Sequence, residues 1–130
     1  MALYAIGDTH LSLGSDKPMD VFGPGWAGYV ERLREGFSDV SEEDTVVLCG
    51  DLSWAMSLEE GRADFAFLQE LPGKKLLLKG NHDYWWSTAA KMRRFWQENG
   101  WDKLDIIHNG CALYGDTALC GTRGWFYEED

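Results

Sequence analysis

The feature that most constrains the fold is a short apolar run that occurs three times, each time followed by a glycine. The runs are ALYAI (2–6), TVVLC (45–49) and KLLLK (75–79). Each has the length of a β-strand, and continuous apolar character is typical of strands buried on both faces, as in a parallel sheet. We therefore expect three neighbouring parallel strands.

Apolar residues at helical spacing follow each of these runs. They form three stripes: Trp26, Val30, Leu33 and Phe37; Phe65, Leu68 and Leu71; and Trp85, Ala89, Met92 and Trp96. Before the second stripe, Ser57 and Glu60 have the form of a capping box. Strands and helices that alternate in this way predict an α/β fold with right-handed crossovers.

The pattern changes after residue 100. In LDIIHNGCALY (104–114), Asn109-Gly110 stands between two β-prone runs, which predicts a hairpin. Gly115-Asp116 predicts a second turn, and TALCG (117–121) a further short strand. We expect an antiparallel meander to begin here, after the parallel part of the sheet.

Polar side chains follow all three predicted strands, in the motifs GDTHL (7–11), GDLSW (50–54) and GNHDYWW (80–86). In open α/β sheets, ligands bind at the carboxyl ends of the strands. The motif residues should therefore gather at one edge of the sheet: Asp8, His10, Asp51, Asn81, His82 and Asp83. The preceding glycines allow sharp turns and close approach of the backbone to a ligand.

These side chains have the chemistry of a site for divalent metal ions such as Mn, Fe or Zn. Asp8 and His10 are two residues apart, so in extended backbone they point the same way and can share one ion. Asp51 can bridge two ions, and Asn81 offers an amide oxygen to the second. In extended backbone His82 points away from Asn81, which makes it a candidate proton donor. Two ions about 3.5–4 Å apart would generate a hydroxide and hold the oxygens of a phosphoryl group.

The three motifs, in this order, resemble the first blocks of the calcineurin-like metallophosphoesterase family, D-x-H, G-D and G-N-H-[DE]. The text around them resembles a bacterial subfamily of predicted phosphoesterases, over essentially all 130 residues. The resemblance implies two mixed β-sheets flanked by helices, a dinuclear metal centre and hydrolysis of a phosphomonoester or phosphodiester. It also implies roles for the motif residues: metal ligation by Asp8, His10, Asp51 and Asn81, general acid catalysis by His82, and orientation of His82 by Asp83.

The sequence departs from the family downstream of these motifs. Family members carry a further metal histidine and a G-H-x-H block, whereas the third and last histidine here is His108, which we interpret as structural. We therefore expect a single domain over residues 1–130 that is incomplete at its C-terminus, with the remainder in a longer native chain or supplied by a partner chain. The alternative is a non-catalytic binding module that keeps the fold with an incomplete metal site.

Three other aromatic or basic residues have two interpretations each. Trp85 and Trp86 follow the third motif and can either stack on an aromatic group of the substrate or pack in the core, and for Trp85 the helical stripe favours the core. Arg123 in GTRGW can pair with a substrate phosphate or form a surface ion pair.

Composition narrows the protein class and the partners. Hydrophobic residues make up 45% and charged residues 26%, as in a soluble globular protein, and no apolar run approaches the length that spans a membrane. The net charge of −10 argues against general nucleic-acid binding. The start resembles no signal peptide, so we expect a cytoplasmic protein. Cys49, Cys111 and Cys120 form no CxxC, so we expect reduced, buried cysteines.

Overall fold

The computed structural model describes residues 1–14, 19 and 23–122. A four-stranded parallel sheet in the order β1-β2-β3-β4 forms its centre, and a two-stranded antiparallel sheet, β5-β6, lies beside it. The strands of the parallel sheet are β1 (Leu3–Ile6), β2 (Thr45–Leu48), β3 (Lys74–Leu77) and β4 (Leu104–Ile106). The helices between them are α1 (Tyr29–Gly36), α2 (Arg62–Glu70) and α3 (Ala89–Glu98). This confirms the predicted mixed α/β architecture.

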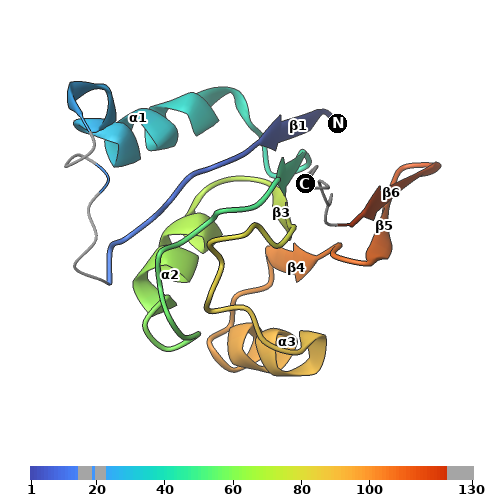
Figure 1. Cartoon of the computed structure of the whole chain (residues 1–130). Helices are drawn as coiled ribbons and strands as arrows, with labels where there is room; N and C mark the ends of the chain where they lie inside the picture. Colours follow the sequence, from blue (N-terminus) through green and yellow to red (C-terminus); the bar gives the residue numbers. More distant parts are fainter. Residues whose placement is uncertain (15–18, 20–22, 123–130) are drawn as a thin grey trace, which may run out of the picture.

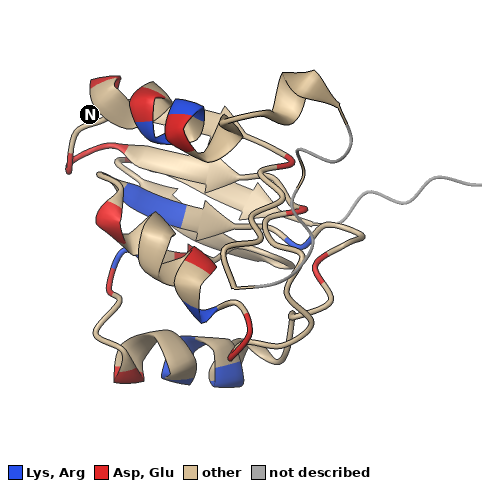
Figure 2. Cartoon of the chain, turned by 90° about the vertical axis from the view of Figure 1, so that its left-hand side faces the viewer, with Lys and Arg blue, Asp and Glu red and all other residues tan. Residues whose placement is uncertain are grey.

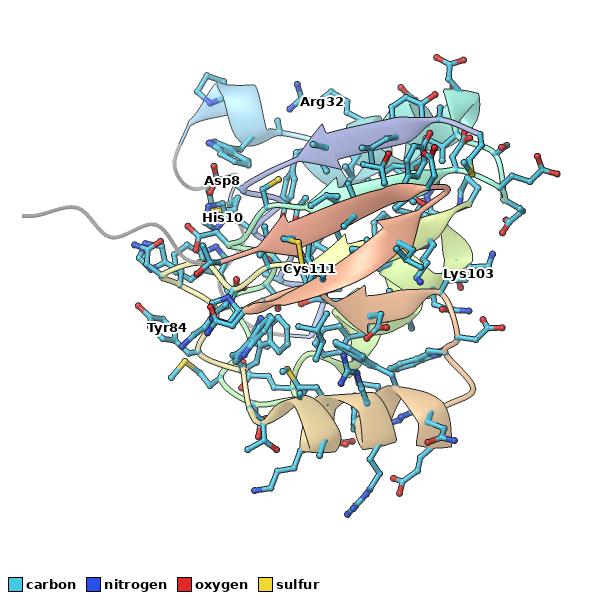
Figure 3. The ribbon with its side chains drawn as sticks, turned by 90° about the vertical axis from the view of Figure 1, so that its right-hand side faces the viewer. Asp8, His10, Arg32, Tyr84, Lys103 and Cys111 are labelled. Atoms are coloured by element: carbon cyan, nitrogen blue, oxygen red, sulfur yellow. A yellow bond between two sulfur atoms is a disulfide. The ribbon has the colours of Figure 1, made fainter. Side chains whose placement is uncertain are left out.

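All three helices lie on one face of the parallel sheet, and the hairpin lies on the other (Figures 1 and 3). The strand order explains this arrangement. Each crossover moves one position in the same direction, and right-handed crossovers then put every helix on the same side. Charged residues lie mainly on the helices and loops, and the strands are largely uncharged (Figure 2).

The core lies between the helices and the sheet. Its largest fully buried side chains include Trp85, Trp96 and Phe65. The Phe65 ring meets the rings of Trp85 and Trp96 edge to face, with centroid distances of 5.0 and 5.7 Å. Trp85 is 2% exposed, so the core interpretation of this residue is confirmed. The strands were expected to be buried on both faces; β2 and β3 are largely buried, but β1 is an exposed edge strand.

All three predicted helices form, but α1 and α3 are shorter than their stripes, and Ala89 of the third stripe is exposed at the start of α3. In the first stripe, Trp26 lies in the short 3-10 helix η2 (Pro24–Trp26) and Phe37 in η3 (Phe37–Asp39), on either side of α1. Ser57 Oγ accepts a hydrogen bond from the Glu60 backbone N at 3.1 Å, as in a capping box, but α2 begins only at Arg62.

The predicted hairpin at Asn109-Gly110 is wrong. The segment before it joins the parallel sheet as β4, in register with β3 from the Lys75–Leu104 pair onward, so its ladder hydrogen bonds go to β3. The chain does turn there, with Asn109 at φ 51°. The antiparallel pair forms one element later, between β5 (Gly110–Tyr114) and β6 (Thr117–Gly121), around the predicted Gly115-Asp116 turn.

The prediction of reduced, buried cysteines is also wrong. Cys111 and Cys120 face each other across β5 and β6 with Cα atoms 4.1 Å apart, and they form a disulfide. Directly opposed positions in an antiparallel pair bring two Cβ atoms close enough for this bond. Cys49 is a free thiol, but it is exposed.

Candidate metal centre

The loops that follow β1, β2 and β3 meet at the carboxyl edge of the sheet. Beyond β1, the chain continues alongside the loop after β2: His10 N donates to Asp51 O at 2.9 Å, and Leu11 N donates to Leu52 O at 2.8 Å. The third loop joins through His82, whose backbone N donates to Asp51 Oδ1 at 2.9 Å. The structure thus brings the three predicted motifs together at one edge.

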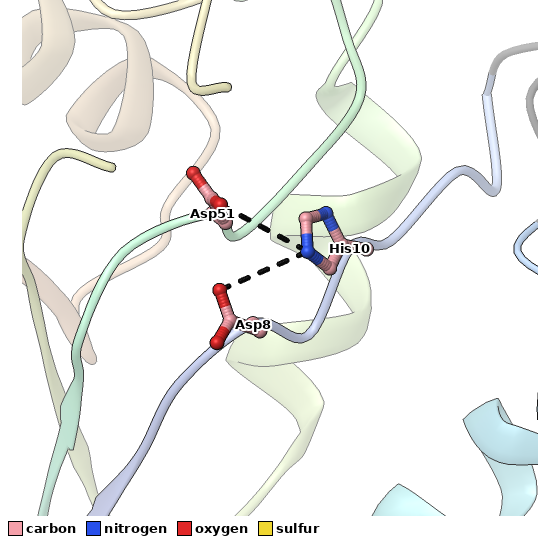
Figure 4. A group of neighbouring side chains, drawn as sticks. All are labelled: Asp8, His10 and Asp51. Carbon is pink, nitrogen blue, oxygen red and sulfur yellow. Dashed lines mark ion pairs between the residues drawn. The ribbon is translucent and has the colours of Figure 1, made fainter. Parts of the chain in front are cut away.

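Asp8, His10 and Asp51 form a cluster there (Figure 4). His10 Nε2 lies 3.8 Å from Asp8 Oδ1 and 3.9 Å from Asp51 Oδ2. One ligand atom from each of the three residues lies within 4.8 Å of the other two. His10 and Asp51 are nearly buried, whereas the Asp8 side chain is 72% exposed, so the cluster opens to solvent on the Asp8 side.

The backbone at these three residues is left-handed. The prediction that Asp8 and His10 point the same way assumed an extended backbone, and this assumption is wrong. The φ angles are 56° at Asp8, 44° at His10 and 48° at Asp51. Positive φ is uncommon outside glycine, and strained backbone of this kind concentrates at functional sites. Three of the four positive-φ non-glycine residues in the described chain belong to this cluster.

Asn81 lies directly against Asp51. One of the two terminal atoms of the Asn81 side-chain amide faces Asp51. This atom lies 3.0 Å from Asp51 Oδ2 and 3.1 Å from Asp51 Oδ1. If this atom is nitrogen, it donates to the carboxylate. If it is oxygen, three acceptor oxygens face one another, an arrangement that a shared cation stabilises. Asp51 thus lies close to both residues: its Oδ2 is 3.9 Å from His10 Nε2 and 3.0 Å from the Asn81 amide.

Two glycines make this approach possible. Gly50 has φ 104°, and a Cβ built on it would lie 2.9 Å from Gly80 Cα. A Cβ on Gly80 would lie 2.2 Å from both Asp51 N and Asp51 Oδ1. The second and third loops are therefore in contact backbone to backbone, so these glycines allow close approach between loops, whereas the prediction was of close approach to a ligand.

The His82 ring lies next to the cluster, with its centroid 6.2 Å from that of His10. Its Nδ1 is 3.1 Å from Tyr84 Oη, and its Nε2 is 3.5 Å from Asn81 Nδ2. The side chains of Asn81 and His82 therefore approach each other instead of pointing apart, because the loop is a turn and not an extended strand. His82 remains half-buried at the edge of the site.

Asp83 has other partners than the expected His82 ring. Its Oδ2 accepts from Gly80 N at 2.7 Å, and its Oδ1 accepts from Leu52 N at 2.8 Å, Ser53 N at 3.3 Å and Trp85 Nε1 at 3.0 Å. Burial raises the pKa of this carboxyl group, although the four donors act in the opposite direction. Asp83 therefore ties the second loop to the third. The group within hydrogen-bond distance of His82 Nδ1 is Tyr84 Oη, and not the Asp83 carboxylate as expected.

Aromatic rings surround the two histidines. Trp54 stacks on His10, with ring centroids 5.0 Å apart and an interplanar angle of 24°, and it lies 5.0 Å from His82. Trp26 meets the edge of His10 at 6.1 Å. Trp86 is half-buried, and its ring centroid lies 5.4 Å from that of His108. His108 therefore packs against Trp86 and does not belong to the cluster of Asp8, His10 and Asp51.

Three further residues support the site, and sequence reasoning missed them. Tyr29 Oη donates to His10 O at 2.7 Å. Ser53 Oγ donates to Asp64 Oδ2 at 2.5 Å, and Asp64 Oδ1 accepts from Leu13 N at 2.8 Å. Asp64 is 1% exposed, and burial raises its pKa. In the sequence, the signal for Asp64 was that an acidic residue occurs at helical spacing from the apolar residues of α2.

Arg123, the predicted contact to a substrate phosphate, lies outside the described residues.

A parallel sheet that carries carboxylates, an imidazole and an amide at its carboxyl edge identifies an α/β protein with a candidate metal site. The sequence profile of the calcineurin-like phosphoesterases matches residues 1–126, and the chain belongs to this family. The match includes all three motifs and every strand and helix of the described residues.

A comparison with curated proteins finds no match. Among solved structures, the chain is similar to the crystal structure of a protein of unknown function from Aquifex aeolicus, with a TM-score of 0.57 and 19% identity. The match covers 91% of this chain and 58% of the other, so the two share a fold and this chain spans little more than half of that protein's length. In the described part of the chain, no helix is long and apolar enough to cross a membrane.

Proposed function

We propose that the chain hydrolyses a phosphomonoester or a phosphodiester at a centre of two divalent metal ions. The observation that carries this proposal is the position of Asp51. Its Oδ2 lies 3.9 Å from His10 Nε2, and one terminal atom of the Asn81 amide lies 3.0 Å from Oδ2 and 3.1 Å from Oδ1. A carboxylate with candidate ligands from two different loops beside it is suited to bridge two ions.

The donor set fits such ions. Two carboxylates, one imidazole and one amide oxygen suit Mn, Fe or Zn. We assign Asp8 and His10 to the first ion, Asn81 to the second and Asp51 to both. Bound ions would supply positive charge that activates a water molecule and neutralises the phosphoryl oxygens. The strained backbone at Asp8, His10 and Asp51 holds these ligands in place in advance.

His82 is the proposed general acid, which protonates the leaving oxygen. Its ring lies beside the cluster but outside the closest group of ligand atoms, as a proton donor should. Asp83 acts as a positioning residue, because its four hydrogen bonds fix the loop that carries His82. Arg123, outside the described residues, is our proposed contact to a substrate phosphate.

A second candidate, a binding module without catalysis, has its own support. Among the described residues, the group of closely spaced metal-ligating carboxylates and imidazoles has only three members, Asp8, His10 and Asp51. Such a site could hold an ion without carrying out the reaction. Metal content and turnover, measured together, separate the two candidates.

The test uses the 130-residue chain loaded with Mn²⁺, its metal content measured by mass spectrometry, and the hydrolysis of p-nitrophenyl phosphate and bis(p-nitrophenyl) phosphate. The matched variants are Asp51→Asn and, as a control in an exposed turn, Asp116→Asn. Metal-dependent turnover that Asp51→Asn alone abolishes supports the enzyme. Bound metal without turnover supports the binding module. A folded chain that binds no metal contradicts the enzyme and is likewise consistent with the module.

A further inference from the structure

A cavity of about 270 Å³ lies directly beside Asp8, on the side of the cluster that is open to solvent. Gly7 and Thr9 of the first motif line it, together with Trp26, Tyr29 and Arg32 from η2 and α1. A group in this cavity therefore contacts a proposed metal ligand without entering the metal centre. Figure 3 shows Asp8 and His10 together at this edge of the molecule.

The aromatic wall of the cavity is fixed relative to the centre. Tyr29 Oη donates to the His10 carbonyl at 2.7 Å, which ties the start of α1 to the first metal loop. The Trp26 ring meets Tyr29 edge to face at 5.4 Å and His10 at 6.1 Å. Trp26 and Tyr29 remain half-buried, so part of their ring surface faces the cavity. A wall positioned before the ligand arrives loses little entropy on binding.

Arg32 adds a cation to this wall. Its guanidinium donates to the Gly25 carbonyl, and in the described ranges no carboxylate forms an ion pair with it. Arg34, two residues on, instead lies 3.7 Å from Glu31 and 3.9 Å from Glu70. In a chain of net charge −10, a guanidinium without an acidic partner is available to a ligand. Guanidinium groups stack on planar rings and donate to their acceptor atoms.

We propose that this cavity binds a planar aromatic ring of the phosphoester, so that the preferred substrates are aryl or nucleoside phosphates. This inference rests on the proposed function of the neighbouring centre. The phosphoryl group lies at Asp8, His10 and Asp51, and the ring lies against Trp26 and Tyr29 with Arg32 over its polar edge. The volume suits one ring system, because pockets for whole drug-sized ligands begin at about 300 Å³.

The test measures binding of two probes that contain no phosphorus, adenosine and 4-nitrophenol, to the full chain without added metal. Saturation-transfer NMR detects weak binding, and a titration gives the affinity. Trp26→Leu removes the ring, and Trp26→Phe keeps one. Arg32→Ala removes the cation, and Arg34→Ala on the same helix is its control. Circular dichroism verifies that each variant is folded.

We expect at least one probe to bind. Trp26→Leu and Arg32→Ala should each weaken binding at least about 5-fold, which corresponds to the loss of one stacking contact, whereas Trp26→Phe and Arg34→Ala should change it less than about 2-fold. Binding of adenosine assigns the cavity to a nucleobase, and binding of 4-nitrophenol alone assigns it to a simple aryl group. If neither probe binds, or if Arg32→Ala and a folded Trp26→Leu bind as the wild type does, the inference is overturned. This result is independent of metal and turnover, so it is distinct from failure of the proposed function.

Discussion

Gly80 leaves no space for a side chain next to Asp51, because a Cβ on Gly80 would lie 2.2 Å from both the backbone N and Oδ1 of Asp51. The proposed bridging carboxylate thus depends on a residue that contributes no ligand atom. The third loop can bring Asn81 and His82 to Asp51 only because the residue just before them is glycine.

Gly80→Ala should therefore displace Asp51 or the third loop. We expect Mn²⁺ affinity to fall at least about 10-fold, as when an outer partner of a metal ligand is lost. Overpacking should also lower the free energy of unfolding by about 1–3 kcal/mol. Gly25→Ala is the control, since a Cβ there meets nothing within 4 Å. Isothermal titration with Mn²⁺ and urea unfolding give both quantities, and unchanged affinity in Gly80→Ala would contradict the proposed site.

His82→Ala should separate catalysis from metal binding. The contact of His82 with Asp51 is made by its backbone N, which alanine retains. Loss of a general acid typically lowers the rate about 10²–10⁴-fold. We expect this decrease in kcat for p-nitrophenyl phosphate, with metal content unchanged by mass spectrometry. Loss of metal from the variant would show instead that the imidazole is a ligand.

Asp83→Asn should loosen the connection between the second and third loops. The amide that replaces the carboxylate cannot accept on both sides, so it leaves Gly80 N or the donors at Leu52 and Ser53 unsatisfied. We expect the free energy of unfolding to fall by about 1–3 kcal/mol.

The same loosening should weaken metal binding. Asp39→Asn, at an exposed position, is the control for both measurements. Urea unfolding without metal and a Mn²⁺ titration distinguish the two effects. An Asp83→Asn variant as stable as the wild type would show that these hydrogen bonds contribute little.

The site residues could be predicted from the sequence because each one lies close to the end of a strand. The runs at β1, β2 and β3 end within two residues of the observed strand ends. Parallel strands then bring their carboxyl ends to one edge, whatever the distance along the chain. This brings Asp8, Asp51 and Asn81 to the same edge, and Gly50 and Gly80 then allow their loops to approach closely.

Contacts that depend on register or on helix placement could not be predicted in this way. The disulfide follows from the register that places Cys111 opposite Cys120, and the predicted turn at Gly115-Asp116 did not by itself specify this register. Likewise, the contact of Tyr29 with the His10 carbonyl depends on where α1 packs, which an apolar stripe does not specify. The left-handed backbone at His10 is held by its neighbours and has no local signal.

Lys75 provides a last prediction, at the start of β3 and remote from the metal centre. It is fully buried, and its ammonium group donates to the Leu71 carbonyl. Burial lowers its pKa from 10.5 to about 8. Because the folded state loses this proton before the unfolded state does, the unfolded chain binds more protons between about pH 8 and 10.5, and stability rises with pH across this window.

Lys75→Met removes the buried charge and should stabilise the protein most below pH 8, by up to about 3 kcal/mol, which is the free energy of the pKa shift. The gain should shrink as the pH rises toward 10.5, because the lysine of the folded wild type is then already neutral and that of the unfolded chain begins to lose its proton as well. Urea unfolding at pH 7 and pH 10 measures the difference, with Lys74→Met, at the exposed neighbouring position, as the control. An effect of Lys75→Met that is the same at both pH values would mean that the buried ammonium is fully compensated by its surroundings.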